Sequence, residues 1–350
     1  MAGMTDTARR PPRGIRNTRR GGIAALTAVA ATLSMAACGS GSAASSGGTV
    51  TGKFGVIQAA DTPTGRSAKQ FAQLVSKYTR GTVKIDVYPN SQLGTGDSML
   101  QATEGGTVSF YSSPVLSSVV PESSALELPL LFPSEHKGSK ILNDGTLDKV
   151  LWNKFKPHNL TYMGSWMVGY SSILTRNTPI HNPTDVHGLR IRVFEPVVST
   201  KLYSKLGATA VTLPGGQVVS ALSTHSIDGV DDPPSTLTGN HFYDGMHDVA
   251  VTSHTLVSSP VIASSKFLSQ LNKSQLAAVK RAMHESIAPN LADADKTNQQ
   301  SLKTMRDAGL TITHPSQSAY QPVAKNVTTQ LNGKFSDVIN AVHTAISSSS

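Results

Sequence analysis

The chain has 350 residues, 31 Lys and Arg against 22 Asp and Glu, and a formal net charge of +9. Six arginines and one aspartate precede Cys38, so a chain that starts at this cysteine carries only +4. The excess positive charge therefore belongs to the N-terminal segment and gives no case for binding nucleic acid. The length suits two domains of ordinary size or one large domain.

The first 38 residues follow the order of a lipoprotein export signal. Arginines crowd the segment before position 21, an uncharged apolar stretch spans 21–33, and Met35-Ala36-Ala37-Cys38 ends it with small residues and a thiol. The apolar stretch is shorter than the ~20 residues that a membrane span needs. We therefore expect residues 1–37 to be a signal peptide. Export by the general or the twin-arginine route stays open.

Cys38 is the only cysteine in the sequence. In this interpretation it becomes the first residue, is acylated, and anchors the protein to the outer face of the cell membrane. The alternative is a buried structural cysteine. An acylated Cys38 leaves no thiol for a disulfide, a zinc–cysteine site or a cysteine nucleophile. Residues 38–49 are rich in Gly and Ser and predict a flexible linker.

From Val50 onward, strand and helix patterns alternate. Strands are predicted at 53–57, 83–87, 108–111, 161–167, 171–175, 189–194, 210–212, 229–230, within 254–264, and at 311–313. Helices are predicted at 68–78, 97–103, 136–155, 196–206, 216–223, 274–307, 317–331 and 333–347. Pro289 predicts a kink or break at Ala288. The alternation favours α/β layers around a largely parallel sheet.

The stretch 188–254 contains a series of short motifs in a fixed order. They are Gly188-Leu189-Arg190-Ile191-Arg192-Val193, Leu206-Gly207-Ala208, Pro214, Ala221-Leu222-Ser223-Thr224, Ile227-Asp228-Gly229-Val230-Asp231-Asp232-Pro233, Phe242-Tyr243 and His254. Two more lie in the N-terminal half, Tyr88-Pro89-Asn90-Ser91-Gln92-Leu93-Gly94 and Glu127-Leu128-Pro129-Leu130-Leu131-Phe132. In this order and spacing the series resembles the solute-binding proteins of tripartite ATP-independent periplasmic (TRAP) transporters, over residues 53–315.

The resemblance implies an α/β, two-lobed periplasmic-binding-protein-like fold with a hinge and a long connecting helix. The lobes would comprise 50–169 plus 256–296, and 170–255 plus 297–350. Closure of the lobes around a small organic acid would produce the form that the TRAP membrane permease subunits recognise.

The resemblance also places Arg192 in the ligand cleft, where its guanidinium grips a carboxylate with two parallel hydrogen bonds. Arg190 shares the strand face by alternation but matches a variable position, so we expect it in solvent.

Three positions depart from the family pattern. The usual second arginine falls on Ser171, the asparagine of Q-E-N-P falls on Asp232, and an acidic residue after an earlier strand falls on Ser113. If Arg192 and Asp232 both face the cleft, its fixed charge is near zero. We then expect a zwitterionic or weakly charged ligand, with its carboxylate on Arg192 and an amine or hydroxyls on Asp232. Alternatively, Asp232 turns away or pairs with Arg192 in the empty protein.

Four aromatic residues complete the expected binding site. Phe194 and Tyr170 flank the strands that carry it, and Tyr111 ends a strand of the first lobe beside Ser113. Trp166 presents a face to the ligand or belongs to the core.

Two other functions compete with solute transport. An exported enzyme is disfavoured because the sequence lacks G-x-S-x-G, H-E-x-x-H, P-loop and dinucleotide-binding motifs. The eleven histidines show no metal-ligand spacing, so neither a metal nor a cofactor is expected. A lipid-tethered sensor domain that passes its signal to a receptor remains the alternative to transport.

Overall fold

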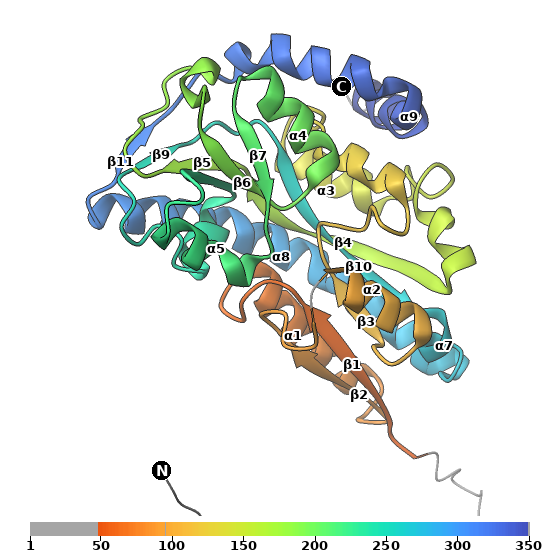
Figure 1. Ribbon diagram of the computed structural model, residues 1–350. Coiled ribbons are helices and arrows are strands. Elements are labelled where there is room, and N and C mark those ends of the chain that lie inside the picture. Colours follow the sequence, from red (N-terminus) through yellow and green to blue (C-terminus); the bar gives the residue numbers. More distant parts are fainter. Residues whose placement is uncertain (1–47, 95, 349–350) are drawn as a thin grey trace, which may run out of the picture. The chain divides into compact units, whose positions relative to one another are not determined.

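A computed structural model describes residues 48–94 and 96–348, which form two mixed β-sheets with helices packed around them (Figure 1). The predicted signal peptide, Cys38 and most of the predicted linker lie outside these residues.

The first sheet has the strand order β2-β1-β3-β10-β4. Strand β1 pairs in parallel with β2 and β3, whereas β10 runs antiparallel to β3 and β4. Alternating apolar residues such as Val83 and Ile85 point into the core from β2. The strands are β1 Val50–Val56, β2 Val83–Tyr88, β3 Phe110–Ser112, β4 Leu160–Tyr170 and β10 Leu256–Ser264.

The second sheet has the order β11-β9-β5-β8-β6-β7. Strand β6 pairs in parallel with β7 and β8, and β9 with β11, whereas β5 is antiparallel to β8 and β9. Both sheets are therefore mixed, and the expectation of a largely parallel sheet is wrong. The strands are β5 Ser172–Thr175, β6 Arg190–Val193, β7 Thr209–Thr212, β8 Gly229–Asp232, β9 Asp248–Ala250 and β11 Thr311–Thr313.

Over the described residues, the chain passes between the sheets three times, twice at adjacent points and once through helix α8 (Lys273–Asp307), which leads from β10 to β11. It leaves β4 at Tyr170 and enters β5 at Ser172, and it returns from β9 to β10 through residues 251–255. The Ser171 backbone N–H donates to the Thr255 carbonyl at 2.9 Å, and the Ser253 N–H donates to the Ser171 carbonyl at 3.1 Å. These hydrogen bonds tie the two crossing segments together.

Helices and short 3-10 turns cover both sheets. The α-helices are α1 Pro63–Tyr78, α2 Gly96–Gly105, α3 Glu135–Asn143, α4 Pro196–Lys205, α5 Gly215–Ser223, α6 Pro234–Gly239, α7 Ser265–Leu268, α8 Lys273–Asp307 and α9 Gln321–Ser348. The 3-10 helices are η1 Pro121–Glu127, η2 Trp152–His158, η3 Pro183–Val186 and η4 Gln317–Tyr320.

Two helix predictions need correction. The predicted helix 136–155 ends at Asn143, because Asp144 caps it and Gly145 follows with a positive φ of 88°. The two predicted closing helices are one, since α9 continues through Gly333 and its apolar stripe stays buried on both sides of that residue.

Helix α8 also differs from expectation. It begins with a capping box of Asn272 and Gln275 and continues for 35 residues with Pro289 inside it, so of the expected kink or break at Ala288 the break does not occur. A proline removes only one backbone donor from a helix. Ser286 and Asn290 are buried on either side of it and bind β4, which holds the helix together through this point. Figure 1 shows α8 passing behind both sheets.

Candidate functional site

Arg192 lies on β6, an inner strand of the second sheet between β8 and β7. Ile191 and Val193 point into the core on the other face, so alternation places the arginines at 190 and 192 together. Arg192 is only 5% exposed, and its Nε donates to the Leu213 carbonyl at 3.0 Å. Arg190 instead forms an outer ion pair with Asp228 at 2.7 Å. Of the two arginines on β6, Arg192 is therefore the buried one.

Asp232 is the ion-pair partner of Arg192. It ends strand β8, and its Oδ2 accepts a hydrogen bond from Nη1 of the guanidinium. Both side chains are buried. Burial raises the pKa of Asp232 to about 7, with Arg192 opposing this rise and the neighbouring carboxylate of Asp231 adding to it. The sequence predicts Asp232 in the ligand cleft and leaves open that it turns away or pairs with Arg192; the structure shows the pair.

Asp231 belongs to a second polar group on the opposite side of β8. Its Oδ2 accepts from the Tyr203 hydroxyl at 2.9 Å and faces His254 Nε2 at 3.2 Å. His254 Nδ1 lies 2.7 Å from the Thr252 hydroxyl, and its ring stacks on Tyr320. Burial alone would raise the pKa of Asp231, but His254 and the Tyr203 hydroxyl hold it below its ordinary value.

Two buried glutamates join these aspartates. Glu195 caps α4, where Oε2 accepts from the Val198 N–H, and Oε1 accepts from the Ser124 hydroxyl of η1, both at 2.8 Å. Glu127, at the end of η1, is 4% exposed, and its Oε2 has no hydrogen-bond partner. Burial raises the pKa of Glu127 well above its ordinary value, and the carboxylates of Glu195, Asp231 and Asp232 raise it further.

Sequence reasoning did not select either glutamate. Glu127 was visible as the only charge in the apolar run from Ala125 to Phe132, where an acid has no structural reason to stand. Glu195 sits directly between a strand and Pro196, a position typical of a helix cap.

Three of the other expected binding residues, Tyr111, Ser113 and Ser171, are buried, and Tyr170 and Phe194 are partly buried. Ser171 is 1% exposed at the crossing between the sheets, and Phe194 is half-buried directly after β6. The Tyr170 hydroxyl donates to the Phe132 carbonyl at 2.8 Å. The Ser113 hydroxyl accepts from the Val115 N–H at 3.0 Å. Tyr111 is fully buried at the end of β3 with no hydrogen-bond partner for its hydroxyl, and burial raises its pKa to about 12.

Trp166 belongs to the core of the first sheet. Its side chain has no exposed surface, stacks on Phe54 with ring centres 5.9 Å apart, and donates from Nε1 to the Ser286 hydroxyl at 2.9 Å. The core role that the sequence left open for Trp166 is therefore the one observed, and we do not count it among ligand contacts.

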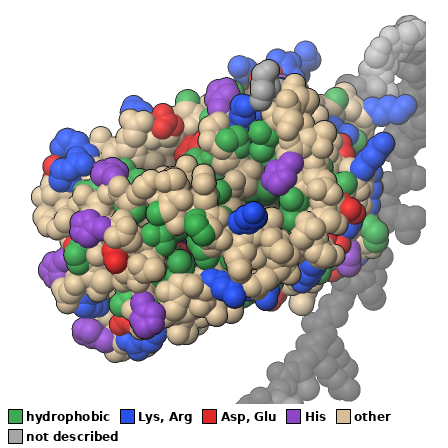
Figure 2. All heavy atoms as spheres, turned by 90° about the horizontal axis from the view of Figure 1, so that it is seen from above, with side chains coloured by type: hydrophobic (Ala, Val, Ile, Leu, Met, Phe, Trp, Pro, Cys, Tyr) green, Lys and Arg blue, Asp and Glu red, His purple; other side chains and the backbone are tan. Residues whose placement is uncertain are grey.

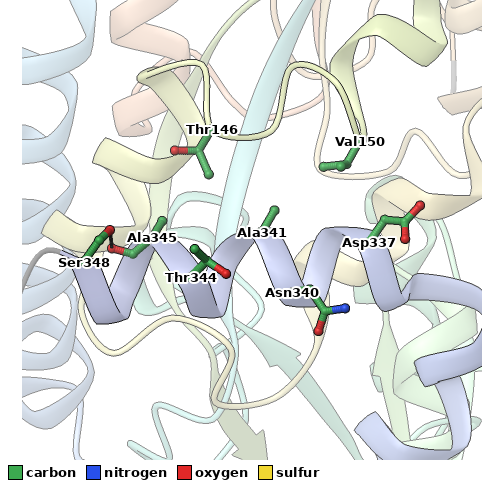
Figure 3. Close-up of a pocket in the computed structure, with 8 residues that line it drawn as sticks. All are labelled: Thr146, Val150, Asp337, Asn340, Ala341, Thr344, Ala345 and Ser348. Atoms are coloured by element: carbon green, nitrogen blue, oxygen red, sulfur yellow. Dashed lines mark hydrogen bonds between the residues drawn. The ribbon is translucent and has the colours of Figure 1, made fainter.

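Two surface hollows share no residue with the Arg192 group. One, of about 570 Å³, lies between α9 and residues 146–150 (Figure 3), where Ala341 and Ala345 face Thr146 and Val150. The other, of about 710 Å³, lies between α1 and β2. On the face shown in Figure 2, acidic and basic side chains are interspersed with uncharged ones. Within 48–94 and 96–348, no group of three or more His, Cys, Asp or Glu could hold a metal ion.

Comparison with known proteins decides the family. Residues 54–335 match the model of the DctP family, described as bacterial extracellular solute-binding protein, family 7. The chain belongs to this family. The C4-dicarboxylate-binding periplasmic protein DctP of Rhodobacter capsulatus is 29% identical over 293 residues, which cover 83% of this chain and 87% of the relative.

Solved structures of solute-binding proteins have the same fold. A TRAP periplasmic solute-binding protein of Sulfurospirillum deleyianum with bound succinate is 25% identical, with a TM-score of 0.79 over 85% of this chain and 99% of that one. A TRAP protein of Desulfovibrio desulfuricans with bound sn-glycerol-3-phosphate has a TM-score of 0.80 at 19% identity, over 85% of this chain and 97% of that one. The predicted periplasmic-binding-protein-like α/β fold is confirmed. These relatives are solute-binding proteins, not enzymes.

Proposed function

We propose that this DctP-family protein captures a small organic carboxylate outside the cytoplasm, holds it on Arg192, and delivers it to the membrane permease of a TRAP transporter. The observation that carries this proposal is the buried guanidinium. Nε and Nη1 of Arg192 are engaged by Leu213 and Asp232, whereas Nη2 makes no hydrogen bond with any described residue. An N–H of Nη2 is therefore available to a ligand carboxylate oxygen, although the two parallel bonds expected from the resemblance would require Nε or Nη1 to release its present partner.

The charge around Arg192 restricts the ligand. When Asp232 is ionised it neutralises the guanidinium, so a dianion such as succinate would be buried without a second cation, at a cost of several kcal/mol. Ser171 supplies none, although the family pattern has an arginine at this position. We therefore propose a zwitterionic or weakly charged acid, with an amine or hydroxyls facing Asp232. Tyr111, Ser113, Tyr170, Ser171 and Phe194 are proposed as further contacts.

The two sheets provide the machinery for capture. We propose lobes of 50–169 plus 256–296 and of 170–255 plus 297–350, which close by bending at the crossing segments near Ser171 and Thr255. A ligand that contacts both lobes stabilises the closed form only by its differential affinity for it.

We also propose that Cys38 carries a lipid anchor on the outer face of the cell membrane. Among the described residues, no helix is long and apolar enough to span a bilayer. The test is Cys38→Ser, which should release the protein from the membrane fraction; a variant that still sediments with membranes would contradict the anchor.

Calorimetry with a panel of small organic acids tests the binding proposal. The natural protein should bind at least one acid, and Arg192→Ala should bind none of them. Arg190→Ala is the matched control, because Arg190 lies on the same strand but pairs outside the site with Asp228. Retained affinity in Arg192→Ala would show that the anchor lies elsewhere.

A further inference from the structure

Glu127 has a buried carboxyl oxygen to which no described residue donates a hydrogen bond. Its side chain is 4% exposed, and Oε2 is buried with no hydrogen-bond partner. Buried polar groups in folded proteins are nearly always paired, and an unpaired one calls for an explanation. A leucine at this position would continue the surrounding apolar run, so packing does not account for an acid there.

Glu127 also faces other acids, and each of those has partners in the chain. Asp232 is paired with Arg192, and Asp231 accepts from Tyr203 and contacts His254. Glu195 accepts from Ser124 and from the first turn of α4. Glu127 stands close enough to all three for their charges to raise its pKa. No lysine or arginine of the described residues forms an ion pair with it.

A second buried carboxylate oxygen, on Asp231, also lacks a hydrogen-bond partner. Asp231 uses Oδ2 for its partners, and Oδ1 is buried without one. Glu127 comes from η1, beside β10 of the first sheet, whereas Asp231 comes from β8 of the second sheet. The two open acceptors therefore come from η1 and β8, and they lie close enough for the charge of Asp231 to raise the pKa of Glu127. A donor group of a ligand at Glu127 would stand near the second acceptor as well.

The nature of that donor follows from the surrounding charge. A hydroxyl has a single O–H and could donate to only one of the two acceptors, and it would leave four carboxyl groups around one arginine and one histidine. A protonated nitrogen has enough N–H groups for both acceptors and also gains from the neighbouring carboxylates. Resting on the proposed function at Arg192, we infer that Glu127 receives a cationic nitrogen of the ligand, and that the solute is therefore an amine-bearing carboxylic acid.

Matched pairs of acids test this inference by thermal shift and calorimetry. The probes are succinate against L-aspartate, glutarate against L-glutamate, and butyrate against 4-aminobutyrate, extended by further amino acids and their amine-free counterparts. We expect stabilisation only by amine-bearing members. Glu127→Gln should weaken their binding at least tenfold. Glu122→Gln is the control, because Glu122 lies on the same η1 but pairs with Lys154 near the surface.

The outcomes separate this inference from the proposed function. Binding of amine-free acids as tight as that of their amine-bearing partners, or unchanged affinity in Glu127→Gln, would overturn the inference while leaving Arg192 as the anchor. Binding of no acid of either kind would overturn the proposed function itself.

Proton release gives a second readout that does not depend on how well Glu127→Gln folds. Burial and the neighbouring carboxylates raise the pKa of Glu127, and a ligand cation at that oxygen would lower it again. Binding of an amine-bearing acid should therefore release a proton, measured by calorimetry in buffers of different ionisation enthalpy. Binding without proton release would contradict a cation at Glu127.

Discussion

The guanidinium of Arg192 and the carboxylate of Asp232 form a buried ion pair across the neighbouring strands β6 and β8, with 6% and 7% of their side-chain surfaces exposed. This pair means that the residue proposed to anchor the ligand is already neutralised by the chain. An incoming carboxylate must share the guanidinium with Asp232, which favours ligands that bring a positive charge of their own.

Removal of Arg192 should destabilise the empty protein as well as abolish binding. Arg192→Ala leaves Asp232 buried without its partner, and breaking a buried pair in this way costs about 3 kcal/mol. The double variant Arg192→Ala with Asp232→Asn should recover part of that loss, because no charge remains to be buried. Urea denaturation measures both free energies of unfolding. Equal stability of the single and double variants would show that the pair does not act as described.

The empty protein should lose stability as the pH rises from about 4 to about 7. The pKa of Asp232 is raised from 3.8 to about 7, so in this range the folded chain holds a proton that the unfolded chain has released. Glu127 and Glu195, whose pKa values are also raised, act in the same direction. Above the raised pKa values the loss is complete.

Urea denaturation at about pH 5 and about pH 8 checks this sign. Asp232→Asn removes one of the contributing groups, so the difference between the two pH values should shrink. A natural protein that is more stable at the higher pH, or an unchanged difference in Asp232→Asn, would contradict the assignment.

Gly169 should not tolerate a side chain. Its φ is +137°, and an added Cβ would lie 2.2 Å from Nδ2 of Asn298. Asn298 donates to the Val168 carbonyl and accepts from the Ser235 N–H, so the substitution disturbs both bonds. We expect Gly169→Ala to cost about 3 kcal/mol, from strain and overpacking together.

Gly188→Ala is the matched control for this prediction. Gly188 also has a positive φ, of +79°, but no atom lies within 4 Å of the added Cβ. Only backbone strain of about 1 kcal/mol applies there. Similar losses in thermal denaturation for the two variants would show that the contact with Asn298 is unimportant.

Ser286→Ala should destabilise the protein without affecting ligand binding. The Ser286 hydroxyl is the acceptor for the buried Trp166 indole N–H, and its loss leaves that donor unsatisfied at a cost of about 1–3 kcal/mol. Denaturation and calorimetry on the same variant separate the two effects. A change in ligand affinity would place Trp166 back among the ligand contacts.

The sequence correctly predicted elements whose signals lie within or directly beside the element itself. The strand at Arg190–Val193, the helix from Pro196 and the strand at Thr311–Thr313 follow from alternation, a proline at the first helical turn and a glycine stop. Gly333 misled the prediction, because the buried apolar stripe on both sides of it outweighs its low helix propensity. At Pro289 the break does not occur, since Ser286 and Asn290 hold α8 to β4. Strand direction depends on how distant segments pair, so the mixed sheets could not be read from the alternation alone.

The candidate site was likewise predictable only where short motifs identify its residues. Arg192 and Asp232 were selected from motifs that lie within one short stretch of sequence. That they pair with each other depends on the register of β6 against β8, which no motif records. Glu127 was overlooked because its acidic surroundings are formed by residues far along the chain, Glu195, Asp231 and Asp232.

Helix α8 has a mechanical consequence for the two sheets. Asn290 fastens it to β4 of the first sheet, and Asn298 and Ser301 fasten it to α6, which follows β8 of the second sheet. Any change in the angle between the two sheets must bend α8 or break these hydrogen bonds. We therefore expect α8 to resist such a change and to bend most easily at Pro289, where one backbone hydrogen bond is missing.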